Sequence, residues 1–228
     1  MRVIMGKHAI EEVAKNDPKR LLKVYTHKKD FQIRGVKPEI VSKQKLERLC
    51  GSESHQGIVA EVKERELLIP KDFLGEDRDE SLVLMVDSIQ DPQNFGSILR
   101  AAECFGVDAL IYSKNRNVAL TPVVSKASVG ASETVPLMPV ANLADTLKKF
   151  QEEGYFSVAA ELRDRSESLF SFDFPSKTLL IMGAEGSGIQ PLLSKKSDFH
   201  VMIPMLGSID SLNVSQATAV FLSQFRSN

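Results

Sequence analysis

The chain has 228 residues, 43% of them hydrophobic and 26% charged, which is typical of a globular protein with one large domain or two unequal ones. Its two cysteines, Cys50 and Cys104, are too few for a disulfide framework and indicate a reducing compartment, so we expect a cytoplasmic protein. The apolar runs are far shorter than the about 20 residues that cross a bilayer. No signal peptide is visible, and the scattered histidines lack metal-ligand spacing, so we expect neither a membrane association nor a metal site.

Charge is distributed unevenly along the chain. Residues 1–63 contain 14 Lys and Arg against 8 Asp and Glu, a net charge of +6, and the remainder contains 15 against 22, a net charge of −7. A basic front module is a weak sign of a polyanion-binding domain, although solvated surface charge can partition in this way without function. Residues 64–80 are acidic and broken by Pro70 and Gly75, so we interpret them as a linker between a domain over 1–63 and a domain over 81–228.

The front module mixes short helical and strand patterns. The spacing of apolar residues predicts helices over 9–15 and 44–49, and β-rich runs predict strands over 22–26 and 57–62. This mixture indicates a small α/β domain.

Strands and helices alternate regularly in the second domain. We expect strands over residues 82–86, 109–112, 155–160, 178–182 and 201–203. We expect helices over 95–105, near 122–129, from the cap Asn142 through 153, and over 214–225. Such alternation predicts a parallel sheet covered by helices on both faces.

Unusual residues follow three of these strands, at the sheet edge where ligands bind in such folds. The first group, after 82–86, is Asp91, Pro92, Asn94, Gly96 and Arg100. Taken alone, this segment is typical of a turn with a helix cap.

The second group is the glycine-rich segment Gly183, Glu185, Gly186 and Gly188. Closely spaced glycines let a backbone approach a ligand. The order G-x-x-G-x-G is not that of a dinucleotide fold, which disfavours hydride transfer with a nicotinamide cofactor. Glu185 could hold a hydroxyl group or cap a turn.

The third group runs from Ile203 to Ser215 and contains Ser211, Leu212 and Asn213, directly before a helix. Considered alone, Ser211 or Asn213 is expected to act as the helix N-cap.

The three groups together, in this order, resemble the SpoU family of RNA 2′-O-ribose methyltransferases within the SPOUT superfamily. The family motifs D-P-x-N-x-G-x-x-x-R, G-x-E-G-x-G and I-P-M-x-G-x-x-x-S-L-N-V-S are all present, and residues 126–136 (KASVGASETVP) are also family-like. The similarity extends over 81–228. It implies a deep trefoil knot in the second domain, a fold that general rules of chain topology do not lead one to expect.

The resemblance also implies a cofactor, a partner and roles for individual residues. S-adenosylmethionine would be the methyl donor, without a metal, and the active protein would be a homodimer whose site is completed across the interface. The residues implied in cofactor binding are Gly183, Gly186, Gly188, Ile203 and Leu212. The residues implied around the reacting ribose are Asn94, Arg100, Glu185, Ser211 and Asn213.

The front module is similar, around residues 6–13 and 55–60, to the small domain of the 23S ribosomal RNA guanosine methyltransferases of this family. That domain resembles RNA-binding ribosomal proteins. His8 and His55 could contact RNA, or each could be a buried structural histidine. Lysines and arginines that neutralise phosphates would dominate the affinity. Candidates for these contacts are Lys19, Arg20, Lys28, Lys29 and Arg34.

Three functions remain open from the sequence. The favoured one is 2′-O-methylation of a ribose in ribosomal RNA, with a guanosine of 23S rRNA as the expected target. The second is the same reaction on transfer RNA, which the front module disfavours because most such family members lack it. The third is a non-catalytic RNA-binding factor on the same scaffold. The presence of both Arg100 and the Ser211–Asn213 segment disfavours this function, because RNA binding alone needs neither.

Overall fold

A computed structural model describes residues 1–227. Within it the chain forms two compact units, each built from several segments. Unit 1 comprises residues 1–66, 91–100 and 119–134, and unit 2 comprises 67–90, 101–118 and 135–227. Unit 1 therefore contains two segments that lie within the expected methyltransferase domain.

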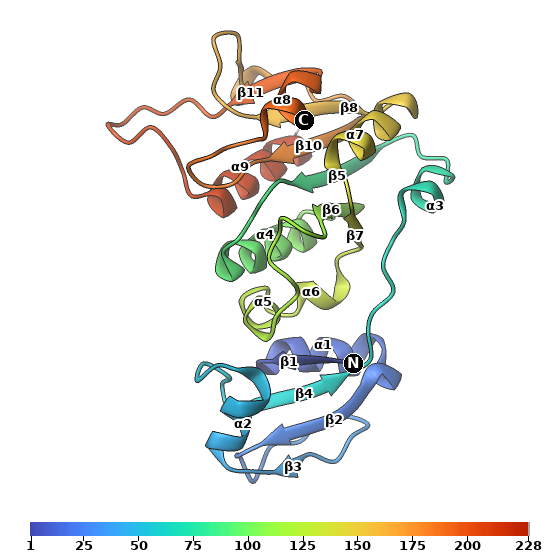
Figure 1. Cartoon of the computed structure of the whole chain (residues 1–228), viewed down its shortest axis with the longest axis vertical. Helices are drawn as coiled ribbons and strands as arrows, with labels where there is room; N and C mark the ends of the chain where they lie inside the picture. Colours follow the sequence, from blue (N-terminus) through green and yellow to red (C-terminus); the bar gives the residue numbers. More distant parts are fainter. Residues whose placement is uncertain (228) are drawn as a thin grey trace. The chain divides into compact units, whose positions relative to one another are not determined.

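Unit 1 is built on a four-stranded sheet with the order β1-β4-β2-β3 (Figure 1). The strands are β1 (Arg2–Met5), β2 (Leu21–Thr26), β3 (Glu39–Ile40) and β4 (Ile58–Val62), and the helices beside them are α1 (Lys7–Asn16), the 3-10 turn Pro18–Arg20 and α2 (Lys43–Cys50). Strand β4 is antiparallel to both β1 and β2, and β3 is parallel to β2. Apolar residues of α1 pack on one face of this sheet, and Leu46 and Cys50 of α2 pack with Tyr25 on the other.

Two short helices from the middle of the chain, α5 (Pro122–Ala127) and α6 (Ala131–Thr134), complete unit 1. The backbone N–H of Met5 donates to Oγ of Ser125 over 3.1 Å. The buried carboxylate of Glu133 in α6 receives the guanidinium groups of Arg2 at 2.6 Å and Arg20 at 2.9 Å. Arg20 is thus held in a buried ion pair, which corrects its assignment as an available phosphate ligand.

Unit 2 contains a seven-stranded sheet in which every strand pair is parallel, as the alternation of elements predicts. Its order is β7-β6-β5-β10-β8-β11-β9. The strands are β5 (Ser81–Val86), β6 (Ala109–Ser113), β7 (Leu137–Val140), β8 (Phe156–Ala160), β9 (Glu167–Ser168), β10 (Lys177–Met182) and β11 (Phe199–Met202). The central strands β5 and β10 are almost entirely buried, which fits their continuous apolar sequences.

Helices cover both faces of this sheet. The helices are α3 (Pro70–Leu74), α7 (Leu143–Glu152), α8 (Pro191–Lys196), α9 (Val214–Ser227) and a 3-10 turn at Leu169–Ser171. Residues of α3, α7 and α8 share a buried cluster with one face of β5, β6 and β10, and Figure 1 shows α9 on the opposite face. Helix α4 (Pro92–Cys104) is divided between the two units at residue 100.

Residues 64–80, expected to be a linker, contain ordered structure. The side chain of Phe73 in α3 is buried and stacks on Phe150 with ring centroids 5.8 Å apart. The N–H of Leu68 donates to the carbonyl of Leu137 over 2.8 Å. Residues 67–80 therefore belong to unit 2, and Phe73 lies in its core. Among residues 1–227, no helix is long and apolar enough to cross a membrane.

Candidate active site

The glycine-rich segment after β10 folds into a tight loop. Ala184 and Gly188 exchange backbone hydrogen bonds of 3.1 and 2.9 Å, which close the loop on itself. A Cβ atom on Gly183 would lie 2.2 Å from the carbonyl carbon of Gly188. Gly183 is therefore required by the loop's own backbone, and not only by an approaching ligand. Gly186 and Gly188 lie in open space but have positive φ angles of 80° and 65°, which favour glycine.

The segment between β11 and α9 reaches this glycine loop. The Oδ1 atom of Asn213 accepts hydrogen bonds from the backbone N–H and the hydroxyl of Ser215, over 2.9 and 2.6 Å, so Asn213 caps α9. Its side-chain amide donates to the carboxylate of Glu185 at the tip of the glycine loop. Asn213 thus performs the capping role that local sequence suggests and also joins the second and third motifs.

A pocket of about 1020 Å³ lies between these loops and the loop that follows β8. Its lining includes residues 183–189 and 210–214, together with Glu161 and Arg163. A smaller adjoining pocket of about 220 Å³ shares part of this lining and continues to Ile203, Met205 and Phe221, with mostly apolar surface. Two adjoining chambers at the carboxyl edge of a parallel sheet, one of mixed polarity and one mostly apolar, are typical of a small-molecule binding site.

A cluster of polar groups borders this pocket at the end of β8. The Oε1 atom of Glu161 forms an ion pair with Nε of Arg163 at 2.9 Å and lies 2.8 Å from Nδ1 of His200. The hydroxyl of Ser194 donates to the same carboxylate. These contacts hold the carboxylate of Glu161 in place at the pocket wall.

The structure places most of the predicted site residues together. Those lining the larger pocket are Gly183, Glu185, Gly186, Gly188, Ser211, Leu212 and Asn213, and Ile203 lines the adjoining one. Asn94 and Arg100 lie on the part of α4 that belongs to unit 1.

Within unit 1, the first motif has a clear structural basis. Oδ1 of Asp91 accepts from the backbone N–H groups of Gln93 and Asn94, over 2.6 and 2.9 Å, and so caps α4. A Cβ atom on Gly96 would lie 2.4 Å from Cβ of Ala127, so this glycine permits close packing of α4 against α5. The side chain of Arg100 is exposed, and no hydrogen bond or ion pair to it is found within residues 1–227.

One residue at this edge was not predicted from the sequence. Asp87, directly after β5, is fully buried, and its carboxylate accepts from the backbone N–H of Gln190 over 2.8 Å and from the hydroxyl of Ser88 over 2.9 Å. The side chain of Gln190 donates to Asp87 and accepts from Arg116. This network fixes the C-terminal end of the glycine loop. A charged residue at the end of a wholly apolar strand was the available signal.

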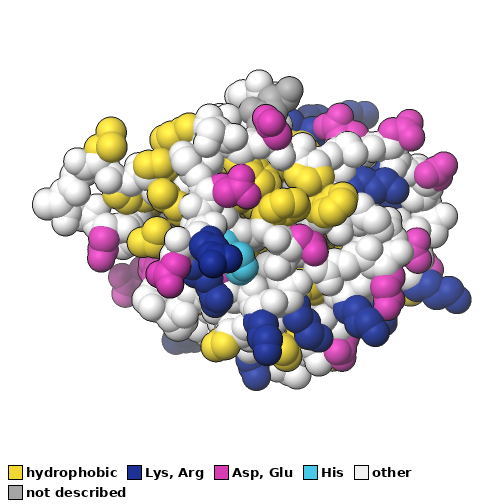
Figure 2. Space-filling model, turned by 90° about the horizontal axis from the view of Figure 1, so that it is seen from above, with side chains coloured by type: hydrophobic (Ala, Val, Ile, Leu, Met, Phe, Trp, Pro, Cys, Tyr) yellow, Lys and Arg dark blue, Asp and Glu magenta, His cyan; other side chains and the backbone are white. Residues whose placement is uncertain are grey.

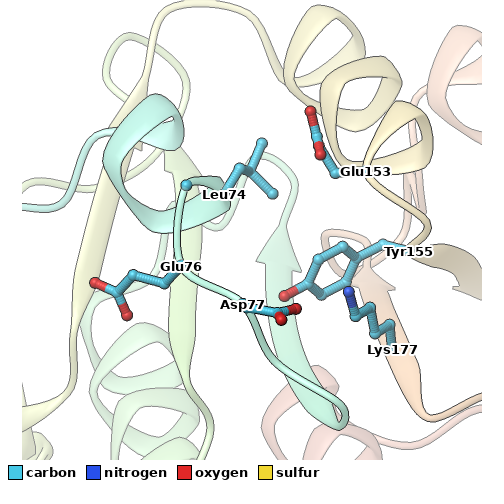
Figure 3. Close-up of a pocket in the computed structure, with 7 residues that line it drawn as sticks. Leu74, Glu76, Asp77, Glu153, Tyr155 and Lys177 are labelled. Atoms are coloured by element: carbon cyan, nitrogen blue, oxygen red, sulfur yellow. The ribbon is translucent and has the colours of Figure 1, made fainter.

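Another pocket of about 220 Å³ lies at the opposite, amino-terminal edge of the sheet (Figure 3). Leu74, Glu76, Asp77, Glu153, Tyr155 and Lys177 line it. The ammonium group of Lys177 lies 5.9 Å from the centre of the Tyr155 ring, and burial raises the pKa of that tyrosine. No predicted site residue lies there. Among the described residues, no cluster of histidine, cysteine, aspartate or glutamate has the arrangement of a metal site.

The two histidines of the front module that are candidates for RNA contact differ in their exposure to solvent. His55 is buried, its Nδ1 accepts the backbone N–H of Gly57 over 2.9 Å, and burial lowers its pKa. It is therefore a structural histidine. His8 is exposed at the start of α1, where its ring lies 3.6 Å from the carboxylate of Glu11.

Known protein families match both parts of the chain. Residues 81–223 match the SpoU rRNA methylase family, and residues 3–68 match the substrate-binding domain of RNA 2′-O ribose methyltransferases. The chain belongs to the SpoU rRNA methylase family. The SpoU motifs are the segments that line the larger pocket and form the first turns of α4.

Individual SpoU relatives match over nearly the whole chain. The 23S rRNA (guanosine-2′-O-)-methyltransferase RlmB of Shewanella oneidensis is 37% identical, over 96% of this chain and 94% of its own length. A solved structure of a putative RNA methyltransferase of the TrmH family from Porphyromonas gingivalis is 27% identical, with a TM-score of 0.78 over 100% of this chain and 90% of that one. The SpoU methyltransferase AviRb from Streptomyces viridochromogenes, in complex with AdoMet, shares the fold at 22% identity, with a TM-score of 0.77 over 98% of this chain and 88% of its own.

Proposed function

We propose that this SpoU-family chain transfers a methyl group from S-adenosylmethionine to the ribose 2′-hydroxyl of a guanosine in 23S ribosomal RNA. The observation that carries the proposal is the end-to-end similarity to a methyltransferase named for this reaction. The match of residues 3–68 to a substrate-binding domain favours ribosomal over transfer RNA, because most family members that act on transfer RNA lack that module.

The pocket at the carboxyl edge fits the proposed donor. The apolar chamber around Ile203, Met205 and Phe221 suits an adenine ring, and the backbone of the glycine loop can approach the ligand closely. Glu161 and Glu185 place carboxylates in the larger chamber, where they would offset a positively charged sulfonium. When bound, the donor supplies a methyl group on a positively charged sulfur. We assign cofactor binding to Gly183, Gly186, Gly188, Ile203 and Leu212.

We assign Arg100 a positioning role at the RNA. A guanidinium keeps its proton in proteins because its charge is delocalised over three nitrogens, so it is poorly suited to act as a base. The exposed Arg100, which has no partner in residues 1–227, is suited to bind a phosphate through two parallel N–H hydrogen bonds. With the ribose held in that way, the 2′-oxygen would attack the methyl carbon in line while the carbon–sulfur bond of the donor breaks. Its electron pair would go to the sulfur, neutral S-adenosylhomocysteine would leave, and the hydroxyl proton would pass to water.

The remaining polar residues of the motifs would line the reacting ribose. We place Asn94, Glu185, Ser211 and Asn213 there on the basis of the family motifs. The hydrogen bond between Glu185 and Asn213 supports a shared role, because the side-chain amide of Asn213 fixes the orientation of the Glu185 carboxylate.

We propose the domain limits 1–63 and 81–228, with 64–80 between them, and a trefoil knot in the second domain. The family matches, which end at residue 68 and begin at residue 81, support the two domain limits. The knot rests on the family resemblance alone.

We further propose that the active form is a cytoplasmic homodimer. Figure 2 shows hydrophobic side chains gathered on the face of unit 2 seen from above. Exposed large hydrophobic residues of unit 2 include Phe156, Leu162, Phe170, Leu206 and Ile209, and Leu206 is fully exposed. Clusters of exposed apolar residues on a globular protein mark interaction sites. The cytoplasm is where ribosomal RNA and unpaired cysteines are expected.

Methyl transfer to separated RNA classes tests the proposed function. The protein is incubated with methyl-labelled S-adenosylmethionine and, in parallel, with 23S rRNA, 16S rRNA and transfer RNA that lack 2′-O-methyl groups. We expect label in 23S rRNA alone. Label in transfer RNA would support the alternative substrate, and binding of 23S rRNA without any transfer would support a non-catalytic factor.

A further inference from the structure

The end of the front sheet where β1 and β2 finish and β4 starts gathers positive and polar side chains from four separate segments. The N–H of Gly6, after β1, donates to the carbonyl of Ile58 over 3.3 Å, and the N–H of His27, after β2, donates to the carbonyl of Gly57 over 3.4 Å. These bonds bring the ends of the three strands side by side (Figure 1). Helix α5 packs beside the same end of β1.

Gln56 and Lys126 approach Gly6 at this end, and Lys28 approaches Gly57, the residue after Gln56. A Cβ atom on Gly6 would lie 3.3 Å from Oε1 of Gln56 and 3.4 Å from Cγ of Lys126. A Cβ atom on the neighbouring Gly57 would lie 2.9 Å from Cε of Lys28. Lys126 comes from the middle of the chain, so this group joins the front module to the family-like segment 126–136.

Gln56 is held rigidly in an unfavourable conformation. Its φ angle is 57°, a left-handed value that a non-glycine residue adopts at a cost of about 1 kcal/mol. The ring of the buried His55 fixes the next residue by accepting the N–H of Gly57, and His27 covers Gly57 so closely that a Cβ there would lie 2.4 Å from Cε1 of the histidine. The result is an exposed amide side chain presented by a stiff turn.

The same end contains polar groups that the fold does not use. The Nδ1 atom of His27 is buried and has no hydrogen-bond partner within residues 1–227. Neither Lys28 nor Lys126 makes an ion pair in that part of the chain. Lys7, by contrast, lies 3.6 Å from the carboxylate of Glu11, which offsets part of its charge, and the ring of His8 lies 3.6 Å from the same carboxylate.

From this arrangement we infer that Lys28, Gln56 and Lys126 form a contact surface for the sugar-phosphate backbone of the substrate RNA, which we call the strand-end surface. The inference rests on the proposed function and specifies which part of the front module holds the RNA. The two lysines would neutralise neighbouring phosphates, and the amide of Gln56 would donate to a phosphate or 2′-hydroxyl oxygen. Since Lys126 directly precedes Ala127, which packs on Gly96 of α4, the surface would continue toward the helix that carries Arg100.

A matched pair of double variants tests the strand-end surface. K28Q/K126Q removes two charges from it, and K15Q/K63Q removes two exposed charges from the other end of the same sheet, where β2 begins and β4 ends. The affinity of each protein for 23S rRNA is measured over a series of salt concentrations, together with the thermal midpoint and S-adenosylmethionine binding by calorimetry.

We expect K28Q/K126Q to bind the RNA about tenfold more weakly near 0.1 M salt and to lower the slope of log affinity against log salt by about 1.4, which is about 0.7 per lost phosphate contact. K15Q/K63Q should change both values far less. Donor binding and the thermal midpoint should stay at wild-type values in both. Equal losses in the two double variants, or no loss in K28Q/K126Q, would overturn the inference. If the wild-type protein neither binds nor methylates 23S rRNA, the proposed function fails and the surface inference fails with it.

Discussion

The side-chain amide of Asn213 donates a hydrogen bond to the carboxylate of Glu185 across 28 residues of sequence. Asn213 is also the cap of α9, since its Oδ1 accepts from the N–H and hydroxyl of Ser215. A single side chain therefore fixes the start of the last helix and the tip of the glycine loop. We conclude that the shape of the pocket depends on this link between the second and third motifs.

Asn213→Ala should affect both stability and donor binding. Loss of an N-cap asparagine costs about 1 kcal/mol of unfolding free energy, and the loss of the bond to Glu185 should loosen the glycine loop. Asn142→Ala is a matched control, because Asn142 caps α7 through the N–H groups of Ala144 and Asp145, outside the pocket. Denaturant titration should show similar losses in both variants, whereas calorimetry should show weaker donor binding only in Asn213→Ala. Wild-type donor affinity in Asn213→Ala would argue against the link.

The glycines of the loop should differ in tolerance to alanine. Gly183→Ala would place a methyl group against the backbone of Gly188, so the loop cannot keep its shape and donor binding should be lost. Gly186→Ala meets open space and should cost only about 1 kcal/mol for its positive φ. Gly154→Ala, with a φ of 83° and open space after α7, controls for that backbone cost. Calorimetric donor titrations rank the three variants, and normal binding in Gly183→Ala would show that the loop is misassigned.

The strand pattern and the motif positions could be predicted from the sequence because both are local. The apolar runs of β5 and β10 and the polar residues after them predicted a parallel sheet with a site at its carboxyl edge. Strand β7 was not predicted because Pro139 interrupts a run of only four residues, and β3 and β9 have two residues each. Such short strands depend on pairing with neighbours and not on a pattern of their own.

Local sequence patterns did not predict the contacts between segments that are far apart in the chain. The carboxylate of Asp87 and the N–H of Gln190 are 103 residues apart in the chain. The ion pair between Glu133 and Arg2 spans 131 residues and makes segment 119–134 part of unit 1. Its consequence is that removing residues 1–63 would expose the buried carboxylate of Glu133 without its partners. Point variants such as K28Q/K126Q are therefore better tests of the front module than truncation.

The stability of the front module should depend on pH through His55. Burial lowers the pKa of His55 below its ordinary value of 6.5, and its neutral Nδ1 accepts the N–H of Gly57. The unfolded chain therefore binds a proton more readily than the folded one. This contribution to stability is fully present above pH 6.5 and is lost as the pH falls through the folded pKa.

Urea titrations between pH 7 and pH 5 measure this effect. We expect the unfolding free energy of the wild-type protein to fall more steeply toward pH 5 than that of His55→Gln, by about 1 kcal/mol, which is the net contribution of one hydrogen bond. Glutamine keeps an acceptor for Gly57 but does not titrate in this range. His8→Gln, at an exposed position, should behave like the wild type. If His55→Gln had the same pH dependence of stability as the wild type, the assignment of this effect to His55 would be wrong.

Arg100→Lys separates positioning from proton abstraction. Lysine keeps the positive charge and deprotonates more readily, but it lacks the planar donor fork. If Arg100 positions a phosphate, the variant should bind the donor normally and lose activity at every pH. The measurement is a pH–rate profile with 23S rRNA as substrate. Activity that recovers as the pH approaches the lysine pKa would instead identify residue 100 as the base.

The identity of the methylated nucleoside tests the central claim most directly. Unmodified 23S rRNA is incubated with the protein and S-adenosylmethionine, digested to nucleosides and fragments, and analysed by mass spectrometry. The account predicts 2′-O-methylguanosine at one position of 23S rRNA, and its loss when the donor site is disrupted by Gly183→Ala. A methyl group on a base, on another ribose, or on transfer RNA alone would contradict the account.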